Sequence, residues 1–413
     1  MKNFSTNRKI AAPVVSVLFG LAALSAVSCN KDLMSRSPSG LSTQTPEIAL
    51  SLGQTARMLA ELPLGIEQVR EVQEAVSASV ANGYDEEYPF RNLFEAPGTG
   101  VGDAELLSRF PELRSRASGR GEEAGLLRSL LSYALFTRSE NPAASRTVQQ
   151  ELVESGFQIY WPYSEDWDGK TLPVITFHPE NGSESNVGYL RVPQPDGSWK
   201  IEEKVVNEEL AMQRPVWVVN RNEDAGGMTP QLFAKLAASL PQSESGPVSR
   251  AGSGELRTLT LKEFRASRNY DSWFAGASEF YVKCGSVENF TASTEEDLLR
   301  YHPSITDFMI VVRRKQVNHT ISFNAVLVSE WTSQLQDSAF LIIEDDGGTR
   351  TSWKCSANVK IKSKVYGFDV ELPFRSRDDI VWRGRLSNRY FEKYNNLMGH
   401  YGDVSITFRI ASI

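Results

Sequence analysis

The chain has 413 residues, with 44 basic and 51 acidic side chains, a formal net charge of −7, 41% hydrophobic residues and 23% charged residues. This composition is typical of a folded soluble protein and excludes a mainly disordered chain, a collagen-like chain and a protein with many membrane spans. The acidic balance argues against nucleic-acid binding, which needs clustered Lys and Arg. The length is sufficient for two or three domains.

The N-terminus carries the pattern of a secretion signal. Lys2, Arg8 and Lys9 precede an apolar stretch at 14–27, which is shorter than the roughly 20 residues that cross a bilayer. The stretch ends in Ala26-Val27-Ser28-Cys29. Small residues before a cysteine resemble the lipobox of bacterial lipoproteins, in which the thiol is acylated and becomes the new N-terminus. An ordinary cleaved signal with an incidental cysteine is the alternative.

We therefore expect residues 1–28 to be a lipoprotein signal peptide and Cys29 to carry a lipid anchor, whose acyl chains hold the protein at a membrane. The next residue is Asn30 rather than Asp, unlike the usual signal for retention in the inner membrane. The expected location is the outer membrane or cell surface of a Gram-negative bacterium. Residues 29–44 are predicted to be a flexible tether.

Residues 45–140 are predicted to be helical. Thr45-Pro46-Glu47 is a favourable helix start, with a capping hydroxyl, a proline in the first turn and an acid near the positive end of the dipole. We interpret the apolar stripes that follow as the core of a small bundle, with a partner-binding face as the alternative. The stripes are Ile48, Leu52, Leu59 and Leu62; Ile66, Val69, Val72, Val76 and Val80; and Leu126, Leu127, Leu130, Leu131 and Leu135.

Residues 145–240 are predicted to form a β-rich middle domain. Strands are expected at Phe157–Trp161, Val174–Phe177 and Val216–Val219, separated by turn signals such as Asp168-Gly169 and Asp196-Gly197. A short helix is expected from Pro230 to Leu240, and the segment 241–255, rich in Ser, Gly and Pro, is predicted to be a linker.

Residues 256–413 are predicted to form an antiparallel β-sandwich, because several short strands follow one another at regular spacing. The expected strands are Glu279–Cys284, Phe308–Arg313, Asn324–Val328, Ala339–Ile343, Ser352–Ile361, Phe368–Leu372 and Val404–Ile410. The fold class predicted for the whole chain is α+β and multidomain, with an N-terminal helical region, a β-rich middle block and a C-terminal sandwich.

Two cysteines remain once Cys29 is lipidated. Cys284 alternates with Phe280 and Val282, and Cys355 alternates with other apolar residues of its strand, so both are expected to face the core. In an oxidising compartment we predict a Cys284–Cys355 disulfide. Two buried thiols that never meet are the alternative, because facing inward does not by itself bring the Cα atoms within bridging distance.

The common catalytic signatures are missing from the sequence. There is no P-loop, no dinucleotide-binding glycine fingerprint, no nucleophile elbow and no zinc spacing among the four histidines. The chain is therefore expected not to be an enzyme and to need no cofactor, with calcium binding as the alternative. A hydrolase acting on peptide or glycan with two distant carboxylates stays open as an alternative, because such a pair leaves no local motif.

Two constellations suggest ligands. Trp161 and Trp167, next to acidic residues, would suit carbohydrate stacking, although core packing and a turn explain them equally. Asp271, Asp345 and Asp346 are candidate calcium ligands, because acids at one end of a sandwich supply the oxygens that calcium prefers. A tight acidic hairpin turn is the alternative interpretation of Asp345 and Asp346.

The chain resembles secreted Gram-negative lipoproteins of uncharacterised function with a C-terminal β-sandwich. The resemblance is carried by the lipobox, by Ile159-Tyr160-Trp161-Pro162-Tyr163, by Pro215–Asn220, and by Asp271–Gly276 leading into Glu279–Val282. It implies a membrane-anchored extracytoplasmic protein that binds an envelope protein or glycan without catalysis, and no catalytic residue is carried over. A structural subunit of an envelope assembly is a further alternative.

Overall fold

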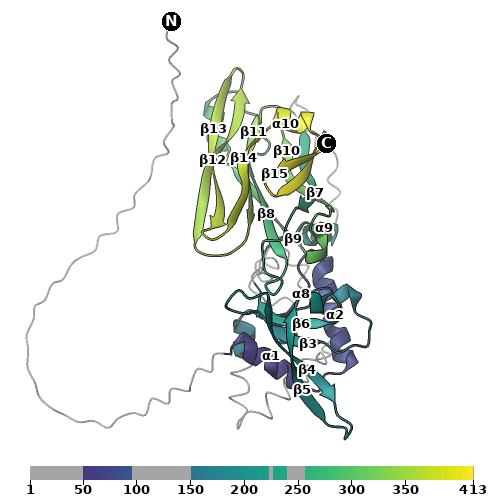
Figure 1. Ribbon diagram of the computed structural model, residues 1–413. Coiled ribbons are helices and arrows are strands. Elements are labelled where there is room, and N and C mark those ends of the chain that lie inside the picture. Colours follow the sequence, from purple (N-terminus) through teal and green to yellow (C-terminus); the bar gives the residue numbers. More distant parts are fainter. Residues whose placement is uncertain (1–49, 95–149, 223–226, 240–255, 413) are drawn as a thin grey trace, which may run out of the picture. The chain divides into compact units, whose positions relative to one another are not determined.

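The computed structural model describes residues 50–94, 150–222, 227–239 and 256–412 (Figure 1). The predicted signal peptide 1–28, the anchor residue Cys29, the tether 29–44, the linker 241–255 and the apolar stripe from Leu126 to Leu135 lie outside these residues. Within the described part of the chain, no helix combines the length and the apolar character that a membrane span requires.

The first structural layer is a six-stranded sheet with the order β1-β2-β6-β3-β4-β5. Neighbouring strands are antiparallel except β3 and β6, which run parallel. Gly169 and Gly197, in two of the predicted turns, have φ of 76° and 84°, a conformation that glycine adopts without strain. The strands are β1 (Glu87–Pro89), β2 (Phe157–Tyr160), β3 (Val174–Phe177), β4 (Ser185–Pro193), β5 (Trp199–Asn207) and β6 (Val216–Arg221).

Helices α1 (Leu52–Glu61) and α2 (Ile66–Ala81) pack on this sheet. The side chain of Ser51 accepts a hydrogen bond from the backbone N–H of Gln54 (3.1 Å) and so caps α1. The apolar faces of both helices share one core with residues of β2, β3 and β6. Of the first two stripes, Leu59, Leu62, Val69, Val72 and Val76 are buried in this core, as predicted. The separate bundle is wrong for the described residues, because the helices cover a sheet that includes β1 from the same region.

The C-terminal part is an antiparallel sandwich of two four-stranded sheets, β10-β7-β16-β15 and β14-β11-β8-β9. Side chains from both sheets meet in one buried core, so the predicted sandwich and the α+β class are confirmed. The strands are β7 (Arg257–Ala266), β8 (Ser278–Ser286), β9 (Ser304–Val312), β10 (Ile321–Trp331), β11 (Asp337–Glu344), β14 (Asp379–Ser387), β15 (Met398–Tyr401) and β16 (Val404–Ser412).

A long hairpin of β12 (Arg350–Ile361) and β13 (Lys364–Arg375) forms a separate two-stranded sheet (Figure 1). Its inner face contributes Val359, Val370 and Leu372 to the sandwich core. All seven strands predicted in this region are present, whereas β7, β14 and β15 were not predicted. The short helices are α3 (Phe90–Phe94), α8 (Glu208–Ala211), α9 (Pro230–Ser239) and α10 (Asn388–Lys393).

The predicted disulfide is wrong, because Cys284 and Cys355 are both free thiols. Cys284 lies in β8 opposite Phe340 of β11 and is 1% exposed, while Cys355 lies in β12 opposite Val370 and is half-buried. Strand alternation places each thiol against apolar residues, as expected. It does not control the distance between two different sheets, and a disulfide needs Cα atoms about 4.4–6.8 Å apart.

We therefore predict two reactive thiols in an unfolded soluble chain that begins at Asn30. In the folded chain Cys284 should resist a thiol reagent, because burial blocks access and raises the pKa of its thiol. Titration with Ellman's reagent, with and without denaturant and without reductant, measures both states. The double variant Cys284→Ser, Cys355→Ser is the blank, and an unfolded wild-type chain without a reactive thiol would contradict the structure.

Candidate functional site: an acidic pocket and a buried carboxylate cluster

The loop between β7 and β8 carries the residues that build the site. Trp273 (2% exposed) and Phe274 (fully buried) pack in one apolar cluster with residues of β2, β3 and β6. The indole N–H of Trp273 donates to the carbonyl of Glu184 (3.1 Å), and Asn220 Nδ2 of β6 donates to the carbonyls of Phe274 (3.1 Å) and Ala275 (2.6 Å). These contacts hold the loop against the six-stranded sheet.

A cavity of about 420 Å³ lies where this loop meets the sheet. Four acids and one arginine line it, so its charge is negative. Its volume is in the range of about 300–1,000 Å³ that is usual for small-ligand pockets. We call it the acidic pocket; it is lined by Leu50, Ser51, Leu52, Asp85, Phe157, Gln158, His178, Glu180, Asn220, Arg221, Asp271, Ala275, Ala277 and Glu279.

Buried acceptor atoms are a distinctive feature of the acidic pocket. Asp85 is 3% exposed; its Oδ2 accepts the backbone N–H of Ala277 (2.9 Å), but its Oδ1 has no hydrogen-bond partner among the described residues. Asn220, 1% exposed, likewise has an Oδ1 without a partner in the described part of the chain. Burial raises the pKa of Asp85 despite the Ala277 N–H, which favours the charged form. The pocket therefore offers acceptors to a ligand that brings donors.

Three carboxylates meet at the end of the sandwich next to the pocket. Asp271, Glu279 and Glu344 each place an oxygen within 4.8 Å of the other two. Glu344 is the last residue of β11, lies opposite Phe280 of β8 in the strand register, and is fully buried. Asp271 and Glu279 also line the acidic pocket. We call Asp271, Glu279 and Glu344 the carboxylate cluster.

The electrostatics of the carboxylate cluster are unfavourable for the charge of Glu344. Neither oxygen of Glu344 has a hydrogen-bond partner of normal geometry among the described residues, and the nearby Ser278 hydroxyl donates to Asn269 (2.9 Å). Burial, and then the neighbouring acids Asp271 and Asp346, raise the pKa of Glu344 to about 10. A proton on Glu344, or a cation bound beside it, would therefore stabilise the site.

The structure brings one of the three predicted calcium ligands, Asp271, into this cluster and leaves Asp345 out of it. Asp345 Oδ1 accepts the N–H of Gly347 (2.9 Å) and lies 3.4 Å from Arg375 Nη1, and the N–H of Asp346 donates to Asp378 (3.3 Å). These contacts fit the alternative interpretation of an acidic turn. Glu279 and Glu344 were missed, because only the pairing of β8 with β11 brings them together.

Trp161 and Trp167 pack in the core, which is the structural alternative to carbohydrate stacking. Trp161 is 1% exposed and makes edge contacts with Trp167 (5.7 Å between centroids) and Trp217 (5.9 Å). Trp167 Nε1 donates to the carbonyl of Thr171 (2.9 Å). The cavity beside both rings measures about 110 Å³, below the usual size of a ligand pocket. A stacking platform at Trp161 and Trp167 is thus not supported.

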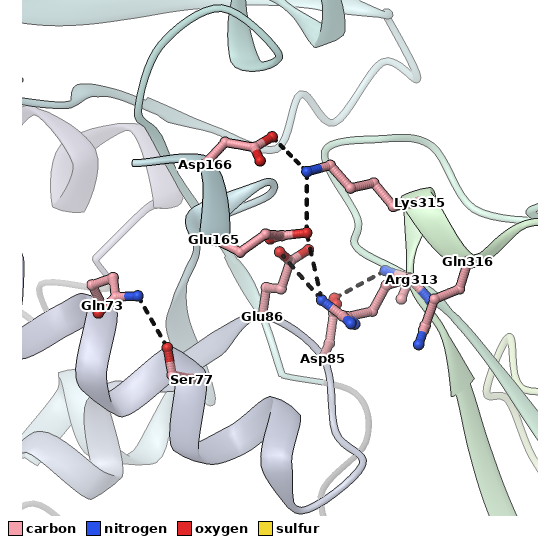
Figure 2. Close-up of polar contacts among 10 residues, drawn as sticks. Gln73, Ser77, Asp85, Glu86, Glu165, Asp166, Arg313, Lys315 and Gln316 are labelled. Carbon is pink, nitrogen blue, oxygen red and sulfur yellow. Dashed lines mark hydrogen bonds and ion pairs between the residues drawn. The ribbon is translucent and has the colours of Figure 1, made fainter. Parts of the chain in front are cut away.

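A second group of acids joins the segment before β1 to the loop after β9 (Figure 2). Arg313 Nη1 lies 3.8 Å from Glu86 Oε1 and 4.0 Å from Glu165 Oε1, while Lys315 Nζ lies 3.2 Å from Glu165 and 2.5 Å from Asp166. Burial, together with Asp85 and a hydrogen bond to Glu165, raises the pKa of Glu86 to about 9.

Within this group, Glu86 is the hydrogen-bond donor and Glu165 the acceptor. Burial opposes the ionisation of Glu165, but hydrogen bonds from Glu86 and Lys315 outweigh it and lower the pKa of Glu165. Two acids with separated pKa values are what a hydrolase uses. Here Glu86 is buried and, unlike Asp85 and Asn220, does not belong to the lining of the acidic pocket, so the pair serves to connect two segments of the fold.

Comparison with protein-family models, with curated proteins and with solved structures found no match to this chain.

Glu86 should make stability depend on pH. Above its ordinary pKa of 4.5 the unfolded chain loses a proton that the folded chain keeps until about pH 9, so the free energy of unfolding should fall across this interval. Glu86→Gln stays neutral in both states, and its stability should fall less between pH 5 and pH 8.5. Urea unfolding at both pH values measures this, with the exposed Glu74→Gln as the matched control. Parallel losses for all three proteins would exclude a buried, protonated Glu86.

Proposed function

We propose that this chain is a lipid-anchored extracytoplasmic protein of the outer membrane or cell surface of a Gram-negative bacterium, and that it binds its ligand without catalysis in the acidic pocket. Cys29 would carry the anchor, and the tether 29–44 would separate the folded part from the membrane. The observation that supports binding is the set of buried acceptors, Asp85 Oδ1 and Asn220 Oδ1, that lack partners among the described residues of a negatively charged pocket.

The chemistry of the pocket selects a donor-rich ligand. An unpaired buried acceptor costs about 1–3 kcal/mol, and a ligand that supplies hydrogens removes this cost. Acids at Asp85, Asp271 and Glu279 disfavour phosphate or carboxylate groups, since like charges repel at short range. Hydroxyl and amino groups, as in the sugars of an envelope glycan, supply donors without negative charge. We therefore propose an envelope glycan as the ligand.

A hydrolytic function is less well supported by the geometry. The acid pair with separated pKa values, Glu86 and Glu165, lies outside the lining of the acidic pocket, and basic side chains cover it. The carboxylate cluster places its acids within 4.8 Å of one another, with the Glu344 side chain fully buried. The carboxyl groups of inverting glycosidases lie about 6.5–9.5 Å apart and those of retaining enzymes about 5–5.5 Å apart, and in both classes the two acids contact the substrate. The buried Glu344 fits neither arrangement, so the geometry favours binding over hydrolysis.

Binding is tested with the soluble chain beginning at Asn30 on an array of bacterial envelope glycans, followed by calorimetry with the best glycan. Glu279→Gln, at the pocket wall, should lower the affinity for that glycan at least about tenfold, because it removes a charged acceptor worth about 1.5–3 kcal/mol. Glu371→Gln, an exposed acid on β13, is the matched control and should bind like wild type. Absence of any glycan signal, or equal affinities of both variants, would reject the pocket as the binding site.

Lipid anchoring is tested by growing cells that express the full chain with labelled palmitate. The wild-type protein should incorporate label and sediment with the outer membrane, because two or more acyl chains anchor stably. Cys29→Ser should incorporate none and leave the membrane fraction, whereas Ser28→Ala, which keeps a small residue before the cysteine, should behave like wild type. A wild-type protein without label would contradict lipid anchoring and would make Cys29 an incidental cysteine of an ordinary cleaved signal.

A further inference from the structure

The carboxylate cluster has the composition of a site for a hard cation. Its members, Asp271, Glu279 and Glu344, offer six carboxylate oxygens and no nitrogen or sulfur, and an oxygen from each lies within 4.8 Å of the others. Oxygen-only sets favour calcium, magnesium or manganese over zinc, which prefers His and Cys. Three ionised carboxylates carry a charge of about −3, which is more than enough to balance the two positive charges of one divalent ion.

The burial of Glu344 is an independent observation that points to a ligand at this cluster. Glu344 is fully buried, and both of its oxygens lack hydrogen-bond partners among the described residues. Buried carboxylates are normally satisfied by donors, because desolvating a charge without compensation is costly. Arg314 contacts this loop, but its Nη2 donates to the carbonyls of Asp271 (2.7 Å) and Gly276 (3.2 Å) and not to Glu344.

The fold holds these acids in place from separate elements. Glu344 ends β11 and Glu279 lies near the start of β8, and these strands are paired in register, with Glu344 opposite Phe280. Asp271 belongs to the loop that Trp273 and Phe274 anchor in the apolar cluster. Because each backbone is fixed by strand pairing or by buried aromatics, the three oxygens are held close together before any ion arrives, as a rigid metal site requires.

We propose that Asp271, Glu279 and Glu344 bind a divalent cation, with calcium as the preferred ion, at the wall of the acidic pocket. Calcium takes 6–8 oxygens in flexible geometry, whereas magnesium demands a strict octahedron. Glu344 holds the ion from the buried side, and Asp271 and Glu279, which line the pocket, leave the opposite side open to a ligand. The inference deepens the proposed function and rests on it in one respect: glycan hydroxyls complete the coordination of the ion.

The experiment is isothermal calorimetry with calcium chloride on the metal-stripped soluble chain that begins at Asn30. Wild type should bind one calcium and prefer it to magnesium at least about tenfold. Glu344→Gln and Asp271→Asn keep the side-chain shape but remove a carboxylate. Each should lower the affinity for calcium at least about tenfold, since the charge of the ligands sets the affinity of such sites. Asp345→Asn is the matched control, an adjacent acid outside the cluster that should retain wild-type affinity.

A second readout separates loss of binding from loss of folding. In chelator, Glu344→Gln should unfold at the same temperature as wild type or higher, because a buried acid becomes a neutral amide. In calcium only wild type and Asp345→Asn should gain thermal stability. If stripped wild type binds no calcium, magnesium or manganese, Glu344 and Asp271 share a proton and the proposal is overturned. It is equally overturned if Asp345→Asn loses calcium while Glu344→Gln retains it.

Glycan binding in calcium and in chelator then separates this inference from the proposed function. If the glycan still binds in chelator and no calcium binds to the protein, the glycan proposal is supported and the metal site is rejected. Calcium bound to the cluster without any glycan signal keeps the metal site and removes the glycan. Glycan binding that is lost in chelator and restored by calcium supports both.

Discussion

The packing of Trp273 and Phe274 against the six-stranded sheet is the contact on which the rest of the site depends. Two large aromatic side chains are almost fully removed from water there, which contributes several kcal/mol on the usual scale of apolar burial. Asn220 adds hydrogen bonds to the carbonyls next to Phe274, so the backbone of the loop is fixed as well as its side chains. The acidic pocket and the position of Asp271 both follow from this anchoring.

The fold then has two groups of buried acids, and it satisfies them differently. Glu86 and Glu165 share a hydrogen bond, and the basic side chains of Arg313 and Lys315 lie against these two acids, so cations of the chain itself compensate this group. Glu344 has only acids and one hydroxyl acting strongly on it, and its oxygens lack partners within the described residues. We assign cation binding to the carboxylate cluster because basic side chains lie against the first group of acids, whereas acids and one hydroxyl surround Glu344.

Sequence patterns predicted the fold well where local alternation decides the structure. The strands of the sandwich and of β2, β3 and β6 follow from runs of apolar residues bounded by turn glycines. β7 and β14 were missed for different reasons. The buried residues of β7 change parity between Leu261 and Phe264, where the strand register shifts, and β14 is an edge strand in which only Leu386 is buried. The helical bundle was wrong because amphipathic periodicity shows that a helix is half-buried, not whether its partner is a helix or a sheet.

Sites that depend on pairing between distant strands could not be predicted from local patterns. Asp271 was identified from its place in a loop, but Glu279 and Glu344 become neighbours only through the register of β8 and β11. The same limit explains why the predicted disulfide is wrong. Residue alternation predicts that Cys284 and Cys355 both face the core, but it carries no information on the distance between the two sheets that hold them. Strand register is the information that alternation lacks.

The most direct measurement of the central claim is a crystal structure of the soluble chain grown with calcium, with data collected at a wavelength where calcium scatters anomalously. The account predicts one anomalous peak bounded by oxygens of Asp271, Glu279 and Glu344, at about the 2.3–2.6 Å that calcium requires. An ordered cluster without a peak, in which a Glu344 oxygen lies within hydrogen-bond distance of Asp271, would show a shared proton and contradict the account.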